Sequence, residues 1–301
     1  MITSSDQHAD KISDLFFGLN SPKKILNLPT KSCEPNELEI PSDDLTNLDN
    51  LISAIIITRK QYKEGNYLVF LPGVAEINAA IKKLNKMTNN KYDCCALHAG
   101  LSPEAITAVL NCPKENPKII FCTDIAQSVL QIPNVQVVMD NGIITENRYD
   151  SKKRLDVMRQ TFISKEQKNL RKACVCVDDY ENGKYICLFS SANLKEEKDP
   201  EILRLALETY LLQLKIINID PMTFPFLTQP SKEELISSYQ LLKEFNCLDN
   251  SIEQAITKKG MLLGSLPFDL KLNNFVVLGH ELYDEGESFA IIAAATLSLV
   301  I

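Results

Sequence analysis

Two cysteines one residue apart are the first feature of this sequence that could do chemistry. Cys174 and Cys176 lie in NLRKACVCVDD, residues 169–179. Paired thiolates bind zinc or carry redox chemistry, but a zinc site usually needs a second cysteine pair or two closely spaced histidines. The chain has nine cysteines, and its three histidines are far apart: His8, His98 and His280. The sequence therefore predicts no metal site, and it predicts that the cysteines are small buried side chains.

Composition excludes several classes of protein. Of the 301 residues, 45% are hydrophobic, so the chain can bury a core, and its length suits about two domains. The net charge of −7 gives no overall attraction for a polyanion, so nucleic-acid binding would need a local surface. The N-terminal residues are polar where a secretory signal needs an apolar stretch, and the longest apolar runs are too short for a bilayer. We therefore expect a cytoplasmic or nuclear protein with no membrane partner.

The elements that would position chemical groups follow an alternating α/β pattern. Apolar strands and amphipathic helices are expected as follows: strands at residues 66–73, 92–100, 117–124, 135–142 and 183–190, and helices at residues 48–62, 74–87 and 101–111. Apolar strands between amphipathic helices indicate a parallel sheet covered on both faces. Ligands of such sheets bind beyond the carboxyl ends of the strands, so the loops after Leu71, Leu97 and Cys122 are the places to look.

The chain divides into four segments on the same pattern. Residues 1–47 contain a short helix and too few apolar residues to fold alone, and residues 48–195 form the α/β domain. Residues 196–268 are α-rich, and residues 269–301 begin a further helical domain whose abrupt apolar end indicates truncation. The stretch NLKEEKDP, residues 193–200, is a charged linker. After it, helices are expected at residues 201–219, 231–248, 256–267, 273–282 and 287–301.

Several stretches, in the right order, resemble the DEAH/DExH-box family of RNA helicases. LVFLPGVAEI resembles motif IV, FCTDIAQSVLQIPNVQVVMDNG is similar to the motif V block, and RYDSKKRLDVMRQTFISK resembles the segment that leads into motif VI. The resemblance spans nearly the whole chain. It implies that residues 1–47 end a first RecA-like domain and that residues 48–195 are the second. A winged helix at residues 196–268 and the start of a ratchet-like helical domain would follow.

The resemblance gives the two cysteines a different meaning. Motif VI of the family reads Q-R-x-G-R-x-G-R, and its second and third arginines reach the γ-phosphate. Arg171 matches the first arginine, whereas Cys174 and Val177 stand where the other two would be. Loss of such an arginine costs about 10³–10⁵ in rate. The resemblance therefore implies that the C-x-C is the remnant of an arginine finger, with no catalytic residue left in this motif.

Motif V also departs from the family's pattern. Thr123 stands where the family makes an RNA-phosphate contact, while Asp124 places negative charge where a phosphate would pass. Val129 and Gln131 replace small hydroxyl residues beside the nucleotide. With Arg171, these two residues are the expected remnant of a nucleotide site. The turn Pro72-Gly73 in motif IV is either a simple turn or a place where the backbone approaches RNA.

A basic run from Arg148 to Lys172 leaves two interpretations open. In the family, the part from Arg148 to Arg159 corresponds to a β-hairpin that wedges against RNA, and its contacts here would be Arg148, Lys152, Lys153 and Arg154. Charged residues on a solvated edge strand also prevent aggregation without binding anything. Any RNA binding is expected to be weak and salt-sensitive, because few basic residues contribute.

The sequence leaves three functions open. The sequence contains no G-x-x-x-x-G-K-[ST] loop and no D-E-x-H, so ATP and Mg²⁺ are expected only if a longer parent protein has an intact first RecA-like domain. The first hypothesis is a helicase-like module, impaired in ATP hydrolysis, that binds RNA or acts as a scaffold. The second is the C-terminal half of a working ATP-dependent RNA helicase. The third is a protein-interaction module without RNA contact. Expected partners are RNA, the missing RecA-like and helical domains, and other proteins.

Overall fold

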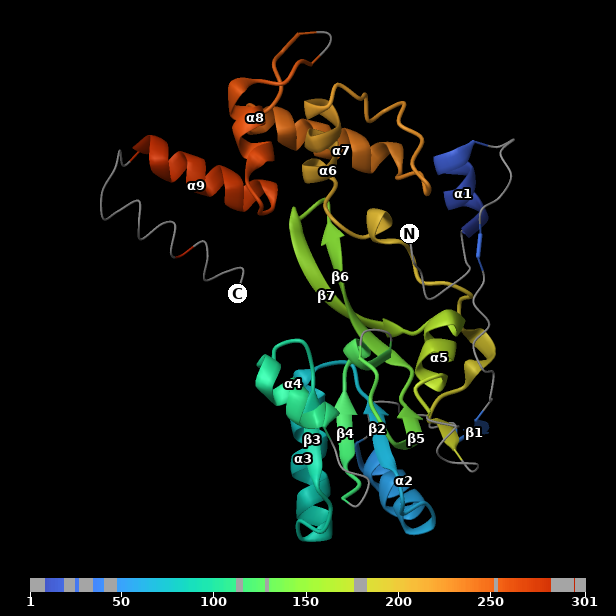
Figure 1. The fold of residues 1–301 in the computed structure, drawn as a ribbon. Coiled ribbons are helices and arrows are strands. Elements are labelled where there is room, and N and C mark those ends of the chain that lie inside the picture. The colour runs from blue at the N-terminus through green and yellow to red at the C-terminus, as the bar shows by residue number, and fades with distance from the viewer. Residues whose placement is uncertain are drawn as a thin grey trace. The chain divides into compact units, whose positions relative to one another are not determined.

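Two compact units make up the computed structural model, which describes residues 9–18, 25–26, 35–40, 48–111, 116–127, 130–175, 183–251, 254–282 and 295. The first unit contains Met1–Glu146 and Met158–Lys198. The second contains Asn147–Val157 and Asp199–Ile301 (Figure 1). The unit boundary near residue 198 lies inside the charged stretch NLKEEKDP. Residues 147–157, which lie between the two parts of the first unit in the sequence, belong to the second unit.

A six-stranded parallel sheet forms the centre of the first unit (Figure 1). Its strands, given in their order across the sheet, are β1 (Asn36–Glu39), β8 (Lys184–Cys187), β5 (Val135–Asp140), β2 (Asn66–Phe70), β4 (Ile119–Cys122) and β3 (Cys94–Leu97). Every residue of β2, β4 and β5 is buried. Continuous burial is what apolar strands without polar alternation require, because both faces of the sheet are covered. The predicted parallel sheet is therefore confirmed.

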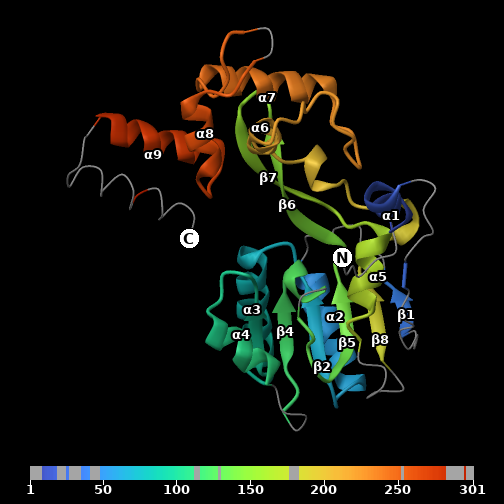
Figure 2. The same ribbon diagram turned by 45° about the horizontal axis from the view of Figure 1, so that its top comes forward.

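Helices cover both faces of this sheet (Figure 2). On one face, α2 (Leu48–Gln61) and α3 (Val74–Thr88) pack against alternate strand residues such as Tyr67 and Val69. On the other face, α4 (Pro103–Leu110) and the region of α5 (Lys165–Lys172) contact the intervening residues such as Leu68 and Phe70. A separate short helix, α1 (Ala9–Phe17), and two one-turn elements, η1 (Asp124–Gln127) and η2 (Ser191–Asn193), complete the unit.

The predicted hairpin consists of β6 (Ile143–Asp150) and β7 (Leu155–Phe162), which form a two-stranded sheet. The Asp150 carboxylate accepts the backbone N–H groups of Lys152 and Lys153, each at 3.1 Å. Arg154 then takes the left-handed conformation, with φ 56°, which returns the chain into β7. The base of the hairpin belongs to the first unit and its tip, residues 147–157, to the second.

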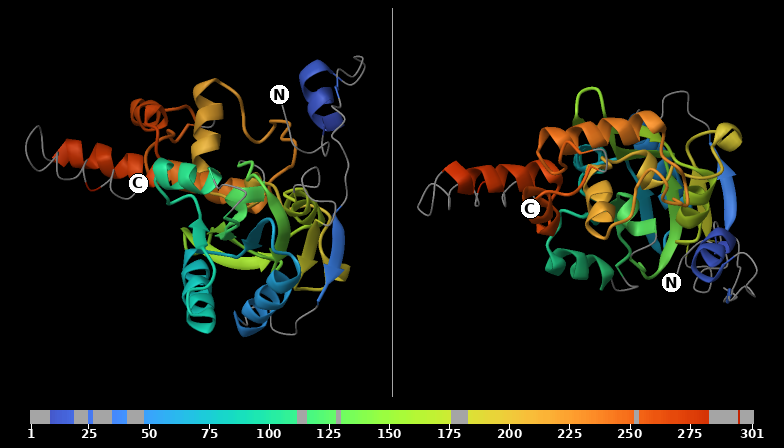
Figure 3. Two further views of the ribbon diagram at one scale, coloured as in Figure 1. Left: turned by 60° about the horizontal axis from the view of Figure 1, so that its bottom comes forward. Right: turned by 90° about the horizontal axis from the view of Figure 1, so that it is seen from above.

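The second unit is α-rich (Figure 3). It contains η3 (Glu201–Leu203), α6 (Glu208–Ile216), α7 (Lys232–Glu244), α8 (Lys258–Ser265) and α9 (Leu270–Leu282). Leucines from all four α-helices form its core, and Leu248 and Ile256 form an isolated antiparallel bridge. The Asn273 amide donates to the carbonyls of Leu263 and Phe268, each at 2.9 Å, which ties α9 to the end of α8.

Two expectations for this unit need comment. The helix expected from residue 201 begins only at Glu208, because the Arg204 carbonyl accepts the Tyr149 N–H at 2.6 Å instead of continuing a helical ladder. The helix expected at residues 287–301 lies outside the described residues, apart from Ala295. Among the described residues, no helix is long and apolar enough to cross a membrane.

Candidate nucleotide and nucleic-acid contacts

Arg171 lies in a fully buried ion pair. Its Nη1 donates to Asp140 Oδ1 at 2.6 Å, and its Nε donates to Gln127 Oε1 at 3.3 Å. The guanidinium carbon also lies 4.6 Å from the centre of the Phe70 ring. The residue is 0% exposed. The side chain of Arg171 is thus enclosed in the first unit, and its place in a nucleotide site stays a prediction from the sequence.

Asp140 organises the groups around this pair. Its Oδ2 accepts the Tyr185 hydroxyl at 2.7 Å, and its Oδ1 also accepts the Gly142 N–H at 2.8 Å. Burial and the neighbouring Asp140 carboxylate raise the pKa of Tyr185 well above its usual value, so this phenol stays a hydrogen-bond donor. The carboxylate at the end of β5 is thus neutralised and hydrogen-bonded inside the unit, as a buried charge requires.

The helix that carries Arg171 is fixed at its start by its own sequence. The Ser164 hydroxyl accepts the Gln167 N–H at 3.2 Å, and Gln167 Oε1 accepts the Ser164 N–H at 3.1 Å. This reciprocal capping box begins α5 at Lys165. Arg171 then projects toward the sheet from the last turn of the helix. It therefore contacts Asp140, which lies 31 residues earlier in the sequence.

Cys174 packs against the core beyond the end of α5. Its thiol lies 3.4 Å from the carbonyl oxygens of Ala126 and Leu170, and the side chain is half-buried among apolar neighbours. A thiol is much smaller than a guanidinium and does not reach out to a phosphate. Val177 and Cys176, which complete the motif, lie outside the described residues.

Burial suppresses the ionisation of several of the six described cysteine thiols. Burial raises the pKa of Cys187 to about 12 and that of Cys94 and Cys247 to about 11. It also raises the pKa of the fully buried Cys122. Thiols in such surroundings are poor nucleophiles and poor metal ligands at neutral pH.

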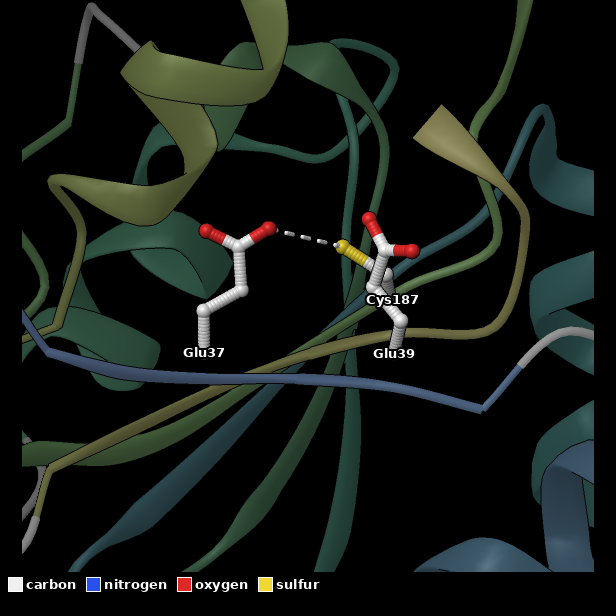
Figure 4. A group of neighbouring side chains, drawn as sticks. All are labelled: Glu37, Glu39 and Cys187. Atoms are coloured by element: carbon white, nitrogen blue, oxygen red, sulfur yellow. Dashed lines mark hydrogen bonds between the residues drawn. The ribbon is translucent and has the colours of Figure 1, made fainter. Parts of the chain in front are cut away.

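One group of side chains has the spacing of a metal site. Glu37 and Glu39 of β1 point toward Cys187 of β8 (Figure 4). Lysines already occupy these carboxylates: Lys168 Nζ lies 2.5 Å from Glu37 Oε1, and Lys172 Nζ lies 3.1 Å from Glu37 Oε2. Burial opposes the charged form, but the two lysines outweigh it and lower the pKa of Glu37. We interpret the group as an ion-pair cluster that joins β1 to α5.

The motif V residues lie at the carboxyl end of β4. Thr123 is half-buried there, and its N–H donates to the Leu97 carbonyl at 3.1 Å. Asp124 and Gln131 are exposed, whereas Gln127 is engaged with Arg171. Val129 lies outside the described residues. Thr123 is thus placed at the edge where parallel sheets bind ligands, with an anionic neighbour beside it.

The basic hairpin residues divide into paired and free cations. Arg154 makes a bidentate ion pair with Glu244 of α7, with distances of 2.5 and 2.8 Å, and Lys153 lies 3.9 Å from Asp150. Within the part of the chain that the structure describes, Arg148, Lys152 and Arg159 are exposed without an acidic partner. Phosphate contacts from this hairpin would therefore come first from the three free cations, because Arg154 would have to leave Glu244.

Tyr149 holds the hairpin tip within the second unit. Its hydroxyl donates to Glu208 Oε1 at 3.2 Å, and the Lys271 ammonium lies 4.9 Å from the centre of its ring. Lys271 also donates to the Arg154 carbonyl. Burial and the Glu208 carboxylate raise the pKa of Tyr149. Most of the predicted wedge, residues 148–157, is therefore part of the second unit.

Pro72 and Gly73 lie beside a groove that the sequence did not predict. Pro72 lines the groove, and Gly73 is the N-cap of α3 in an extended conformation. A Cβ at Gly73 would meet Glu76 Oε2 at 2.9 Å, so the Glu76 carboxylate covers this turn. That negative charge disfavours a phosphate at the place where the family resemblance implied an RNA contact. The one sequence signal for the groove is the pair of small residues Ala75 and Ala79, one helical turn apart.

Known proteins resemble this chain over most of its length. The family described as Helicase conserved C-terminal domain matches residues 46–162. The human probable ATP-dependent RNA helicase DHX34 is 30% identical over 246 residues, which are 77% of this chain and 21% of the relative. The mouse putative ATP-dependent RNA helicase DHX57 is 30% identical over 249 residues, 77% of this chain and 18% of the relative. The chain thus spans about a fifth of the length of these relatives.

Solved structures support the same fold. The structure of the DEAH/RHA helicase HrpB from Escherichia coli superposes with a TM-score of 0.73 at 18% identity, covering 91% of this chain and 39% of that chain. A second HrpB structure gives a TM-score of 0.70 at 20% identity and covers 86% of this chain and 32% of that chain. The family match and the relatives lead to one conclusion: the chain belongs to the DEAH/DExH-box family of RNA helicases and corresponds to part of the family's C-terminal half.

Proposed function

We propose that this chain is a helicase-like module that binds RNA weakly and takes no part in ATP hydrolysis. One observation supports the proposal: Arg171 is buried against Asp140, and Cys174, which the resemblance aligns with a phosphate-directed arginine, packs against the core. Charge stabilisation of the transferring phosphoryl group is most of what such enzymes supply. Among the described residues of α5 and the segment after it, no arginine is left to supply it.

RNA binding is the second part of the proposal, and it is supported by the relatives' names and by the free cations of the hairpin. The relatives DHX34 and DHX57 are named as RNA helicases. Arg148, Lys152 and Arg159 are the available phosphate contacts, with Thr123 at the sheet edge. Phosphate contacts position a strand without reading its bases, so we expect little sequence preference.

Salt-titrated fluorescence anisotropy with a labelled single-stranded RNA tests this proposal. Each neutralised phosphate contributes about −0.7 to the slope of log affinity against log salt, so three cations predict a slope of about −2. Replacing Arg148, Lys152 and Arg159 by glutamine should flatten the slope nearly to zero. The charge-matched control replaces Lys60, Lys63 and Lys91, which are exposed on the side of the sheet where its strands begin, and should keep most of it. Equal losses in the two triple variants, or no binding at low salt, would contradict the RNA assignment.

An active enzyme is the competing proposal. The relatives are named as ATP-dependent, and the chain matches only about a fifth of their length. A parent protein with an intact phosphate loop could hydrolyse ATP with a different arrangement of arginines. ATPase assays on this chain, and on any longer protein that contains it, separate the two proposals.

A further inference from the structure

A groove of about 360 Å³ lies beside the carboxyl end of β2 in the first unit. Its walls come from four parts of the chain: Leu48 and Leu51 of α2, Ala75 and Ala79 of α3, Ile143 at the start of β6, and Gln160 of β7. Because all of these residues belong to one unit, the groove is a feature of that unit alone. The volume is at the lower end of the range for ligand sites, about 300–1,000 Å³. It suits one or two side chains of a peptide.

The interior of this groove is apolar. Leu51, Leu71 and Ile143 are buried at its base, whereas Ala75 and Ala79 are exposed along one side. Two small residues one turn apart let a ligand approach the α3 backbone closely. An aliphatic side chain placed here would leave water and contact apolar atoms on several sides.

Glu76 gives the rim of the groove a carboxylate that forms no ion pair with any cation of the described residues. Its carboxylate accepts a hydrogen bond from Gln160 Nε2 at 2.8 Å. No cation among the described residues lies within ion-pair distance of Glu76. An RNA phosphate or a nucleotide would be repelled from such a rim, while a guanidinium or ammonium group would be attracted.

We propose that the groove binds a short segment of a partner protein in which an aliphatic side chain is followed by arginine or lysine. The aliphatic group enters between α2 and α3, and the cation pairs with the Glu76 carboxylate at the rim. A guanidinium fits best, because it can bind a carboxylate through two parallel hydrogen bonds. This proposal does not depend on RNA binding by the hairpin.

Ligand-observed saturation-transfer NMR on the 301-residue chain tests the groove, with N-acetyl-leucyl-arginine amide as the probe. We expect saturable binding at millimolar probe, and no binding of N-acetyl-leucyl-glutamate amide. Glu76→Gln should weaken binding of the leucyl-arginine probe several-fold. Glu104→Gln, which removes a carboxylate from the first turn of α4, is the matched control and should leave binding unchanged.

Filling the groove provides an independent variant. Ala79→Trp and Ala75→Leu each place a larger side chain at an exposed position on the groove wall, and each should abolish probe binding while thermal unfolding stays near that of the unsubstituted chain. If one variant fails to fold, the other is decisive. Absence of saturable binding, or equal binding by the groove-filling variants, would overturn the proposal.

Discussion

Two carboxylates near the carboxyl edge of the same sheet differ in whether a cation of the described residues pairs with them. Asp140, at the end of β5, is 0% exposed, and Arg171, Tyr185 and a backbone N–H satisfy it. Glu76, in the first turn of α3, has one amide donor and no cation within ion-pair distance among the described residues. The first arrangement stabilises the fold, and the second leaves charge for something else to meet. The same difference separates Arg154, paired with Glu244, from the free Arg148 on the hairpin.

The largest effect should come from breaking the buried pair. Arg171→Ala leaves the Asp140 charge unpaired in the core, so we expect a loss of about 3–5 kcal/mol in the free energy of unfolding of the first unit. Asp140→Ala should cost a similar amount. Urea unfolding followed by intrinsic tyrosine fluorescence measures both.

A double variant sharpens this result. Arg171→Met with Asp140→Leu removes both charges and should recover much of the stability lost in the single variants. A loss below about 1 kcal/mol for Arg171→Ala would mean that the arginine is not held in a buried ion pair.

An intermediate effect should come from the half-exposed cluster of Glu37, Lys168 and Lys172. The folded pKa of Glu37 is lowered, so its stabilisation is complete above the ordinary carboxyl pKa and disappears as the pH falls through the folded value. Each exposed pair is worth no more than about 1 kcal/mol. Glu37→Gln should therefore lower stability slightly at neutral pH and flatten its decline under acid, as followed by urea midpoints from neutral to acidic pH. If stability declined under acid as steeply in Glu37→Gln as in the unsubstituted chain, the Glu37 carboxylate would not contribute to that decline.

The smallest effect belongs to Glu76. Because no cation partners it, Glu76→Gln should change the unfolding free energy by less than about 1 kcal/mol, the range of a charge at a helix N-terminus. Thermal melts of this variant and of Arg171→Ala, measured side by side, test the contrast. A large destabilisation by Glu76→Gln would show that the carboxylate stabilises the fold. The proposed pairing of Glu76 with a cation of a partner would then lose its support.

The sequence predicts local structure well here because each strand is a short apolar run. The strands of the parallel sheet and the helices on its two faces follow from residues close in the chain. Long-range pairs could not be predicted in the same way. Asp140 meets Arg171 across 31 residues, and Arg154 meets Glu244 across 90. The late start of α6 has the same cause, since the Arg204 carbonyl is taken by Tyr149 from 55 residues away in the hairpin.

The candidate sites show the same limit. Family motifs identified Arg171 and the turn Pro72-Gly73 as chemical positions, but only the packed structure shows that the arginine is enclosed and that Glu76 covers the turn. The groove itself joins α2, α3, β6 and β7, so no single stretch of sequence contains its pattern.

The most direct test of the proposed function is ATP hydrolysis by this chain and by any longer parent protein that contains it, with and without single-stranded RNA. We predict turnover at background level that RNA does not raise, because the family resemblance implies that Cys174 and Val177 stand where relatives have phosphate-directed arginines. Restoring both with Cys174→Arg and Val177→Arg should raise turnover only if the parent contains an intact phosphate loop. Several-fold stimulation of the unsubstituted parent by RNA would contradict the account.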